Sequence, residues 1–232
     1  MKPFLAMLLL STMTAVAAAA PPSEVTAEYA VVSTGLTIGR VNESFVRKGD
    51  LYTAHSVTRS EGPLKLLLDD QITLESSGRL GSRGLQPLEF TQHRTKDSNR
   101  DLKTHFDWDK GVVSTLLHGE TSQVTLPRET QDRLSAMYQF LHLESYGPTL
   151  AMPMAMGRRV EQYNYRLVEE GKLATPAGEF DTLHYARVTD KPGDTKVDVW
   201  LAKDRFKFPV RVIFDDPKGF RLEQNLVSLN AR

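Results

Sequence analysis

Apolar and polar residues alternate along most of the chain, and this period of two predicts β-strands. Near the start, Val25, Ala27, Tyr29 and Val31 are separated by polar or small residues, as expected for a strand with one buried face. Residues 197–201 repeat the pattern, with apolar side chains at every second position. We therefore expect a mostly β protein whose strands each bury one face.

Short turn sequences separate these alternating stretches and predict antiparallel hairpins. Residues 48–50 and 109–111 each contain a glycine that can supply the positive φ of a tight hairpin. Residues 175–178 place a proline where its fixed φ favours a turn. A further turn is predicted at residues 169–171. In the last strand the apolar phase slips between residues 222 and 226, which predicts a β-bulge.

One segment in the middle of the chain has the pattern of an amphipathic helix. Its apolar stripe consists of Leu134, Met137, Tyr138 and Leu141. The spacing predicts a helix over about residues 131–142, with Thr130 as a candidate N-cap and a stop at Gly147-Pro148. The predicted fold is thus a strongly curved antiparallel sheet, a β-roll or an open barrel, with this one helix packed against it.

The first twenty residues have the pattern of a cleavable signal peptide. Lys2 supplies a positive charge, residues 4–10 begin an apolar core, and residues 17–20 are small alanines that suit a cleavage site. A membrane-spanning helix needs about 20 strongly apolar residues, and this stretch is shorter and contains hydroxyl side chains. We expect export to the periplasm, and a mature part, residues 21–232, that forms one β-rich domain and does not span a membrane.

The composition excludes several kinds of chemistry. The chain has no cysteine, which removes disulfides, thiol catalysis, cysteine metal sites and a lipid-modified cysteine. Its 29 basic and 29 acidic residues balance, so the net charge does not favour a nucleic-acid partner. The adjacent Arg158 and Arg159 are too few to make a basic patch on their own.

Several short motifs, in order along the chain, resemble a bacterial exported family, DUF3108. They are Tyr29 with Gly35 and Gly39, Gly84-Leu85-Gln86-Pro87, Asp132 with Leu134, Ser135 and Tyr138, Thr175-Pro176 with Gly178, and Trp200-Leu201-Ala202 before Pro209-Val210-Arg211. Each motif is short, and it is their order that makes the match specific. The resemblance implies a β-rich rolled sheet and a location in the cell envelope, and it brings no catalytic residues with it.

Candidate catalytic residues are sparse. None of the six histidines has the spacing of a zinc motif, and no G-x-S-x-G sequence is present. Asp132 and Ser135 share a face of the predicted helix, but His142 is about 10 Å further along the helix axis, so no base completes a triad. The acid pairs 69–70 and 215–216 are adjacent on extended chain, so their side chains point apart and suit turns better than glycoside cleavage.

Three methionines alternate at Met152, Met154 and Met156, which places their sulfur atoms on one face of an extended strand. Thioether ligands select Cu(I), so a copper site is one interpretation. The other is a buried strand in which methionine fills gaps in the core. Pro153 within the motif and the lack of a nearby histidine favour packing.

These observations lead to one main functional hypothesis. We expect a non-enzymatic envelope protein that holds an apolar, lipid-like or glycan ligand inside a rolled sheet, with Phe106, Trp108 and Phe180 lining the site. The alternative is a module that assists envelope assembly through protein–protein contacts, and a hydrolase of envelope polymers is third. No catalytic, metal-binding or cofactor-binding residue is assigned.

Overall fold

The computed structural model of the chain describes residues 20–62, 65, 70–189, 191 and 193–232. The predicted signal peptide, except for its last residue, lies outside these residues, as does Asp69. Within the described part, fourteen strands form one antiparallel sheet. The strands are β1 (Glu24–Ser33), β2 (Leu36–Lys48), β3 (Leu51–Ser60), β4 (Gln71–Gly81), β5 (Gly84–Arg94), β6 (Leu102–Asp107), β7 (Val112–Leu117), β8 (Glu120–Thr125), β9 (Thr149–Ala155), β10 (Val160–Thr175), β11 (Gly178–Val188), β12 (Lys196–Ala202), β13 (Pro209–Asp215) and β14 (Arg221–Ala231).

The sheet consists of two meanders that meet in its middle. Strands β1 to β8 follow one another outward on one side, and β14 back to β9 do so on the other. Strand β1 joins the two halves because it pairs antiparallel with both β2 and β14. The edge strands are therefore β8 and β9, and the connection between them must pass from one end of the sheet to the other.

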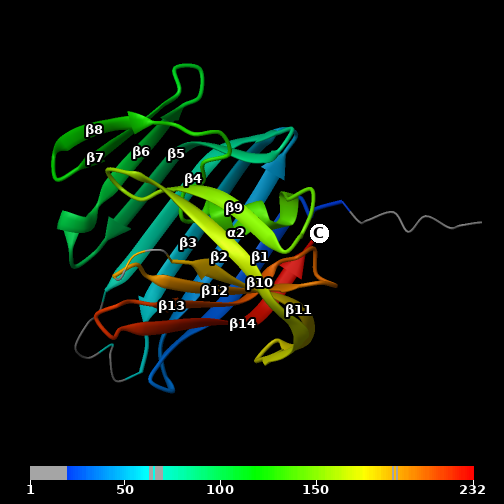
Figure 1. Ribbon diagram of the computed structural model, residues 1–232. Helices are drawn as coiled ribbons and strands as arrows, with labels where there is room; N and C mark the ends of the chain where they lie inside the picture. The colour runs from blue at the N-terminus through cyan, green and yellow to red at the C-terminus, as the bar shows by residue number, and fades with distance from the viewer. Residues whose placement is uncertain (1–19, 63–64, 66–69, 190, 192) are drawn as a thin grey trace, which may run out of the picture.

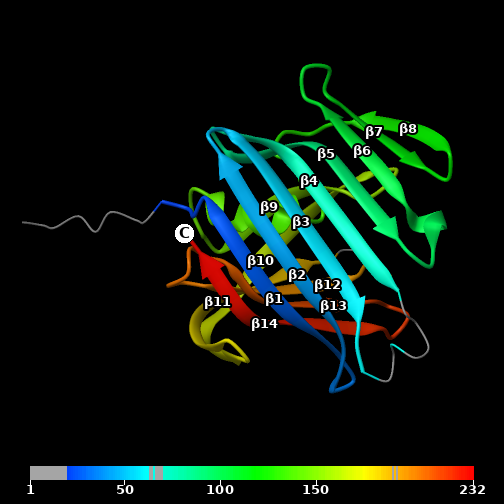
Figure 2. The ribbon, with the colours of Figure 1, turned by 180° about the vertical axis from the view of Figure 1, so that it is seen from behind.

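The sheet curls into an open roll (Figures 1 and 2). Strands twist relative to their neighbours, and sheets of more than about ten strands usually curl. Strands β9 and β10 consequently lie across the concave side of β1–β4 (Figure 1). At the seam, Arg158 in the β9–β10 turn donates to the Leu117 carbonyl at 3.3 Å and to Glu120 at 2.8 Å. The fold class expected from the sequence is confirmed.

The helix lies in the connection between β8 and β9, inside the roll. It is shorter than the sequence predicts, with α2 at Ser135–Gln139 and a 3-10 turn, η2, at Phe140–His142. A second 3-10 turn, η1, spans Ser98–Arg100. Leu134 and Leu141 are 1% and 7% exposed, so the predicted burial of the helix stripe is confirmed.

The helix is shorter because the residues before it have other partners. Gln131 forms a parallel bridge with Met154 of β9, which holds it in extended conformation. The Asp132 carboxylate then accepts from the Leu134 and Ser135 backbone N–H groups, both at 2.8 Å, and caps the helix. Thr130, the expected cap, instead donates to the Pro127 carbonyl, so that assignment is wrong.

The helix is fixed to the β4–β5 turn by one side chain. Gln139 accepts from the Leu85 backbone N–H at 2.7 Å and donates to the Arg83 carbonyl at 3.0 Å. Gly84 makes this approach possible: its φ is +104°, and a Cβ atom there would lie 2.4 Å from the Gln139 side chain. The glycine of the Gly84–Pro87 motif therefore allows the helix to pack against the sheet.

Most of the turns predicted from the sequence are present. Gly49 and Gly111 have φ of +60° and +67° in the turns β2–β3 and β6–β7. The predicted turn at residues 169–171 is wrong, because β10 continues through it with a bulge between Leu167 and Glu169 and pairs along its length with β11. A bulge is present in β14, but it lies between Leu226 and Ser228, opposite Glu28 and Tyr29, just beyond the stretch 222–226 where the sequence predicts it.

Candidate ligand-binding cavity

A cavity of about 340 Å³ lies between the two halves of the curved sheet. Its volume is in the range of small-molecule sites, about 300–1,000 Å³. One wall comes from β2, β3 and β4, the opposite wall from β9, β10, β12, β13 and β14, and the helix closes one side. Most of the lining side chains are apolar or aromatic, including Met137, Phe140, Met154, Tyr163, Val199 and Val212.

A buried carboxyl group, Glu43, faces this cavity from β2. It is 8% exposed, and it accepts hydrogen bonds from the Ser56 hydroxyl at 3.3 Å and the Tyr138 hydroxyl at 3.4 Å. Burial raises the pKa of Glu43 to about 7, and the two hydroxyl donors only partly offset this. At neutral pH the cavity therefore contains a carboxyl group that can be either neutral or charged.

A second buried acid, Asp132, has a structural role. Besides capping the helix, its carboxylate accepts from the Ser76 hydroxyl at 2.6 Å, and Ser76 lies 3.2 Å from the Tyr52 hydroxyl. Burial raises the pKa of Asp132, while the hydrogen bonds from Ser76 and the helix backbone oppose that shift. In the described part of the chain, no histidine is bonded to Asp132 or Ser135, so the pair does not form a triad there.

The other acid pairs also have structural roles. Asp70 accepts from the Thr95 hydroxyl and the Lys96 backbone N–H, which ties the end of β5 to the start of β4. Asp216 accepts from the Lys218 backbone N–H in the β13–β14 turn, as the sequence predicts. Its neighbour Asp215 ends β13.

Next to the cavity lies a more open hollow of about 600 Å³ that is rich in arginine. Its arginines are Arg94, Arg100, Arg133, Arg158 and Arg159, and we call it the arginine-rich hollow. They come from β5, η1, the segment before α2 and the β9–β10 turn. Arg133 and Met156 line both this hollow and the cavity, so the two are adjacent.

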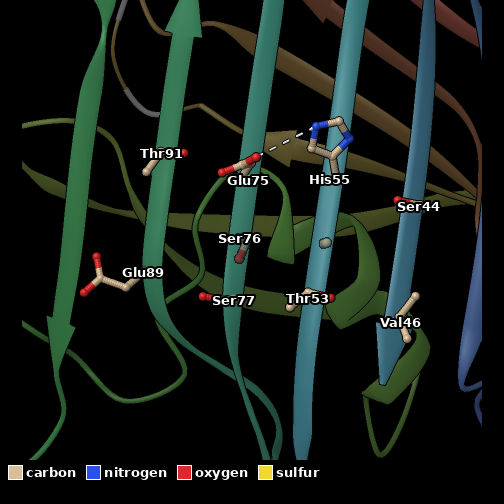
Figure 3. Close-up of a pocket in the computed structure, with 10 residues that line it drawn as sticks. Ser44, Val46, Thr53, His55, Glu75, Ser76, Ser77, Glu89 and Thr91 are labelled. Carbon is tan, nitrogen blue, oxygen red and sulfur yellow. Dashed lines mark ion pairs between the residues drawn. The ribbon is translucent and has the colours of Figure 1, made fainter. Parts of the chain in front are cut away.

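A third hollow, of about 300 Å³, lies on the other face of β2–β5 (Figure 3). Here the outward-facing side chains are mainly polar, and the helical segment passes behind the strands in this view. His55 and Glu75 form an exposed ion pair across β3 and β4, with 4.0 Å between Nε2 and Oε1. We call this region the outer depression.

The structure places the three predicted lining residues outside the cavity. Phe106 and Phe180 are 1% and 7% exposed, and both belong to the larger packed core. Trp108 packs against that core and donates its indole N–H to the Pro87 carbonyl at 2.6 Å. None of the three is among the residues that line the cavity.

The methionine motif lies at the cavity wall. Met152 and Met154 are 3% and 6% exposed in the smaller core cluster, where they pack with Tyr163 and Tyr165. Met154 and Met156 line the cavity. Within the described residues, no group of three or more His, Asp or Glu side chains is placed to hold a metal ion. The contacts of the motif are those of packing residues.

Two polar residues at the cavity, Glu43 and Arg133, were not predicted from the sequence. A signal for Glu43 was present, because it occupies a buried position of β2 between the apolar Val41 and Phe45. A charged residue on the buried face of a strand indicates either that another side chain pairs with its charge or that the charge has a function. Arg133 gave no such signal, since its neighbours in the hollow come from distant parts of the chain.

The fold is that of a curved, barrel-like β protein. A crystal structure of this class, the "beta-barrel-like" DUF1849 protein from Brucella abortus, superposes with a TM-score of 0.58 at 14% identity, over 91% of this chain and 99% of that one. The family model of DUF3108, described as a protein of unknown function, matches residues 26–225. The chain therefore belongs to the DUF3108 family, as its motifs indicated.

Two further comparisons add little. The crystal structure of a lipoprotein candidate from Parabacteroides distasonis matches with a TM-score of 0.34 at 9% identity, over 90% of this chain and 95% of that one. None of the curated proteins matches the chain. Within the described residues, no helix has both the length and the apolar composition needed to cross a membrane.

Proposed function

We propose that this protein is a non-enzymatic, exported envelope protein that binds a single-chain, lipid-like molecule in the cavity. The observation that carries the proposal is the cavity itself, which is lined mostly by apolar and aromatic side chains and has only a few polar groups. Such a site suits an acyl chain better than a glycan, because a glycan needs many hydrogen-bond partners. The signal-peptide pattern of residues 1–20 supports export.

The cavity walls can supply the binding free energy. Each methylene group that leaves water for an apolar site contributes about 0.8 kcal/mol. This corresponds to about a fourfold gain in affinity for each added methylene. The gain should continue only while the cavity has room, and longer chains should then extend into solvent with no further effect. Affinity should therefore reach a plateau at the chain length that fills the cavity.

A titration with fatty acids from C8 to C18 tests this proposal. Displacement of a fluorescent fatty acid should show affinity rising with chain length and then levelling off. Affinity that is independent of chain length, or no displacement at any length, would contradict a cavity site for the acyl chain. For export, N-terminal sequencing of the protein from its host should find a mature chain that begins close to residue 20.

A second candidate function is supported by the edge of the sheet. Strand β8 ends the strand order, so within the described residues no further strand pairs with its outer edge. An extended segment of another protein could add there through backbone hydrogen bonds. Co-purification of a partner that is lost when a proline replaces Gln123 in β8 would favour this assembly role.

A further inference from the structure

The arginine-rich hollow has more positive charge than its own acids neutralise. Four of its five arginines have a carboxylate partner. Arg94 pairs with Asp70 at 3.4 Å, Arg100 with Asp97 at 3.0 Å, Arg158 with Glu120 at 2.8 Å, and Arg159 with Glu161. Among the residues that the structure describes, no carboxylate lies within ion-pair distance of Arg133.

Arg133 is nevertheless held in a defined position. Its guanidinium donates to the Gln92 side-chain carbonyl at 3.0 Å, and the Gln92 amide donates in turn to the Arg100 carbonyl at 2.7 Å. Gln92 is only 7% exposed, so this support is fixed by the core of β5. One terminal nitrogen of the guanidinium is thus bonded to Gln92, and the other N–H groups are available to a ligand.

The position of Arg133 is where the apolar cavity meets the charged hollow. It lines both, together with Met156. The surrounding protein lowers the pKa of Arg133 by desolvation, and the positive charge of Arg94 acts in the same direction. Arg133 is nevertheless exposed to solvent, so an anion can reach its guanidinium, and an acyl chain attached to that anion would extend into the cavity.

We propose that Arg133 binds the anionic head group, a carboxylate or a phosphate, of the single-chain ligand whose tail occupies the cavity. This inference rests on the proposed function, because it assumes that the cavity holds the tail. Guanidinium groups bind both carboxylate and phosphate through paired, parallel hydrogen bonds. The partly neutralised arginines around it add a positive field that favours an anion over a neutral head group.

Four probes of the full-length mature protein test the inference. They are dodecanoate, dodecyl phosphate, the neutral dodecanol and inorganic phosphate, each titrated against wild type, Arg133→Gln, Arg133→Lys and Arg79→Gln. Arg79 is a matched control, because it also donates to a glutamine carbonyl, that of Gln86 at 3.0 Å, but is exposed away from the cavity. Thermal unfolding of each variant checks that the fold is retained.

We expect dodecanoate or dodecyl phosphate to bind wild type more tightly than dodecanol. Arg133→Gln should lower the affinity for the preferred anion about tenfold to a hundredfold, the usual effect of removing a charged hydrogen-bond partner. Arg133→Lys should retain part of it, and Arg79→Gln all of it. Dodecanol should bind wild type and Arg133→Gln equally. The preferred anion identifies the head group as carboxylate or phosphate.

Three results would overturn the inference in different ways. If dodecanol and both anions bind with equal affinity, and Arg133→Gln changes none of them, the cavity binds a tail but Arg133 does not bind a head group. If no amphiphile binds, the proposed function fails together with the inference. Binding of inorganic phosphate as tight as that of dodecyl phosphate would also overturn it, because the tail would then contribute nothing.

Discussion

Strands β2 to β4 have a hollow on each face, and the two hollows are alike in size but not in chemistry. The cavity inside the roll measures about 340 Å³ and the outer depression about 300 Å³. The inner one is walled on the far side by a second layer of strands and by the helix. The outer one is open and lined by hydroxyl and charged side chains such as Thr53, His55 and Glu75.

The curvature of the sheet, rather than any single motif, creates the cavity. Strand β2 presents Val41 and Glu43 inward and Ser44 outward by simple alternation. Inward, these positions face strands from the other end of the chain, and burial raises the pKa of Glu43 to about 7. On the outward face, no strand or helix of the described residues covers Ser44, so polar groups there remain hydrated. The predictions below test this difference between the two faces.

The largest effect is expected where the helix closes the cavity. Leu134→Ala should lower the free energy of unfolding by about 2–5 kcal/mol, because Leu134 is 1% exposed and its removal leaves a void. Leu51→Ala, at a residue that is 63% exposed, is the control and should cost less than about 0.5 kcal/mol. Denaturant unfolding measures both. A loss below about 0.5 kcal/mol for Leu134→Ala would show that the helix does not close a core.

The next effect is the pH dependence that Glu43 imposes. The pKa of Glu43 is about 7 in the folded protein and 4.5 in the unfolded chain. Between these pH values the folded protein keeps a proton on Glu43 that the unfolded chain releases. Stability from this group is complete below pH 4.5 and is lost as the pH rises through 7. Glu43→Gln removes that loss, and above pH 7 the variant should be more stable than wild type by up to about 3 kcal/mol.

The pH dependence of wild type must be compared with that of Glu43→Gln, because His142 also contributes to it. Burial lowers its pKa to about 4 from 6.5, so this group stabilises the fold above pH 6.5 and its contribution is lost as the pH falls through 4. It therefore opposes Glu43 between these limits, whereas Asp132, whose pKa is raised, acts in the same direction as Glu43. Unfolding curves at several pH values should show a difference between wild type and Glu43→Gln that grows from pH 5 to pH 8. A difference that stays constant would contradict the buried carboxyl.

The helix and the two polar residues show what the sequence can and cannot predict. The strands, most turns and the Leu134 stripe follow from local periodicity, because alternation and glycine placement act over a few residues. The helix start could not be predicted from Thr130, since Gln131 is held by Met154 of β9. Arg133 is bonded to Gln92, 41 residues away in the sequence, and Glu43 to Tyr138, 95 residues away, and no local pattern identifies these partners. Phe106 was expected to line the cavity because it is aromatic and lies on the apolar face of its strand, but that face contacts the packed core.

A smaller effect is expected from filling the cavity. Ala136 on α2 lines it, and Ala136→Leu should lower the affinity for dodecanoate about tenfold by occupying part of the space for the tail. Ser44→Leu adds a similar volume on the outward face of β2, in the outer depression, and should leave the affinity unchanged. Isothermal titration calorimetry of dodecanoate with the two variants shows on which face of the sheet the ligand binds. Equal losses, or a loss only for Ser44→Leu, would place the ligand elsewhere than in the cavity.

The smallest effect is expected at the ion pair of the outer depression. His55 and Glu75 are both exposed, so a double-mutant cycle with His55→Ala and Glu75→Gln should give a coupling free energy of less than about 1 kcal/mol. Affinity for dodecanoate should not change in either variant. A large coupling, or a loss of ligand affinity, would mean that the outer depression is the functional face.

The central claim, that the ligand occupies the cavity, is tested most directly by methyl NMR of the methionines. Met137, Met154 and Met156 line the cavity, whereas Met152 is buried beside it without lining it. With ¹³C-methyl methionine, addition of dodecanoate should shift the signals of the three lining residues and leave that of Met152 the least changed. Binding without shifts at Met137, Met154 and Met156 would show that the ligand lies outside the roll.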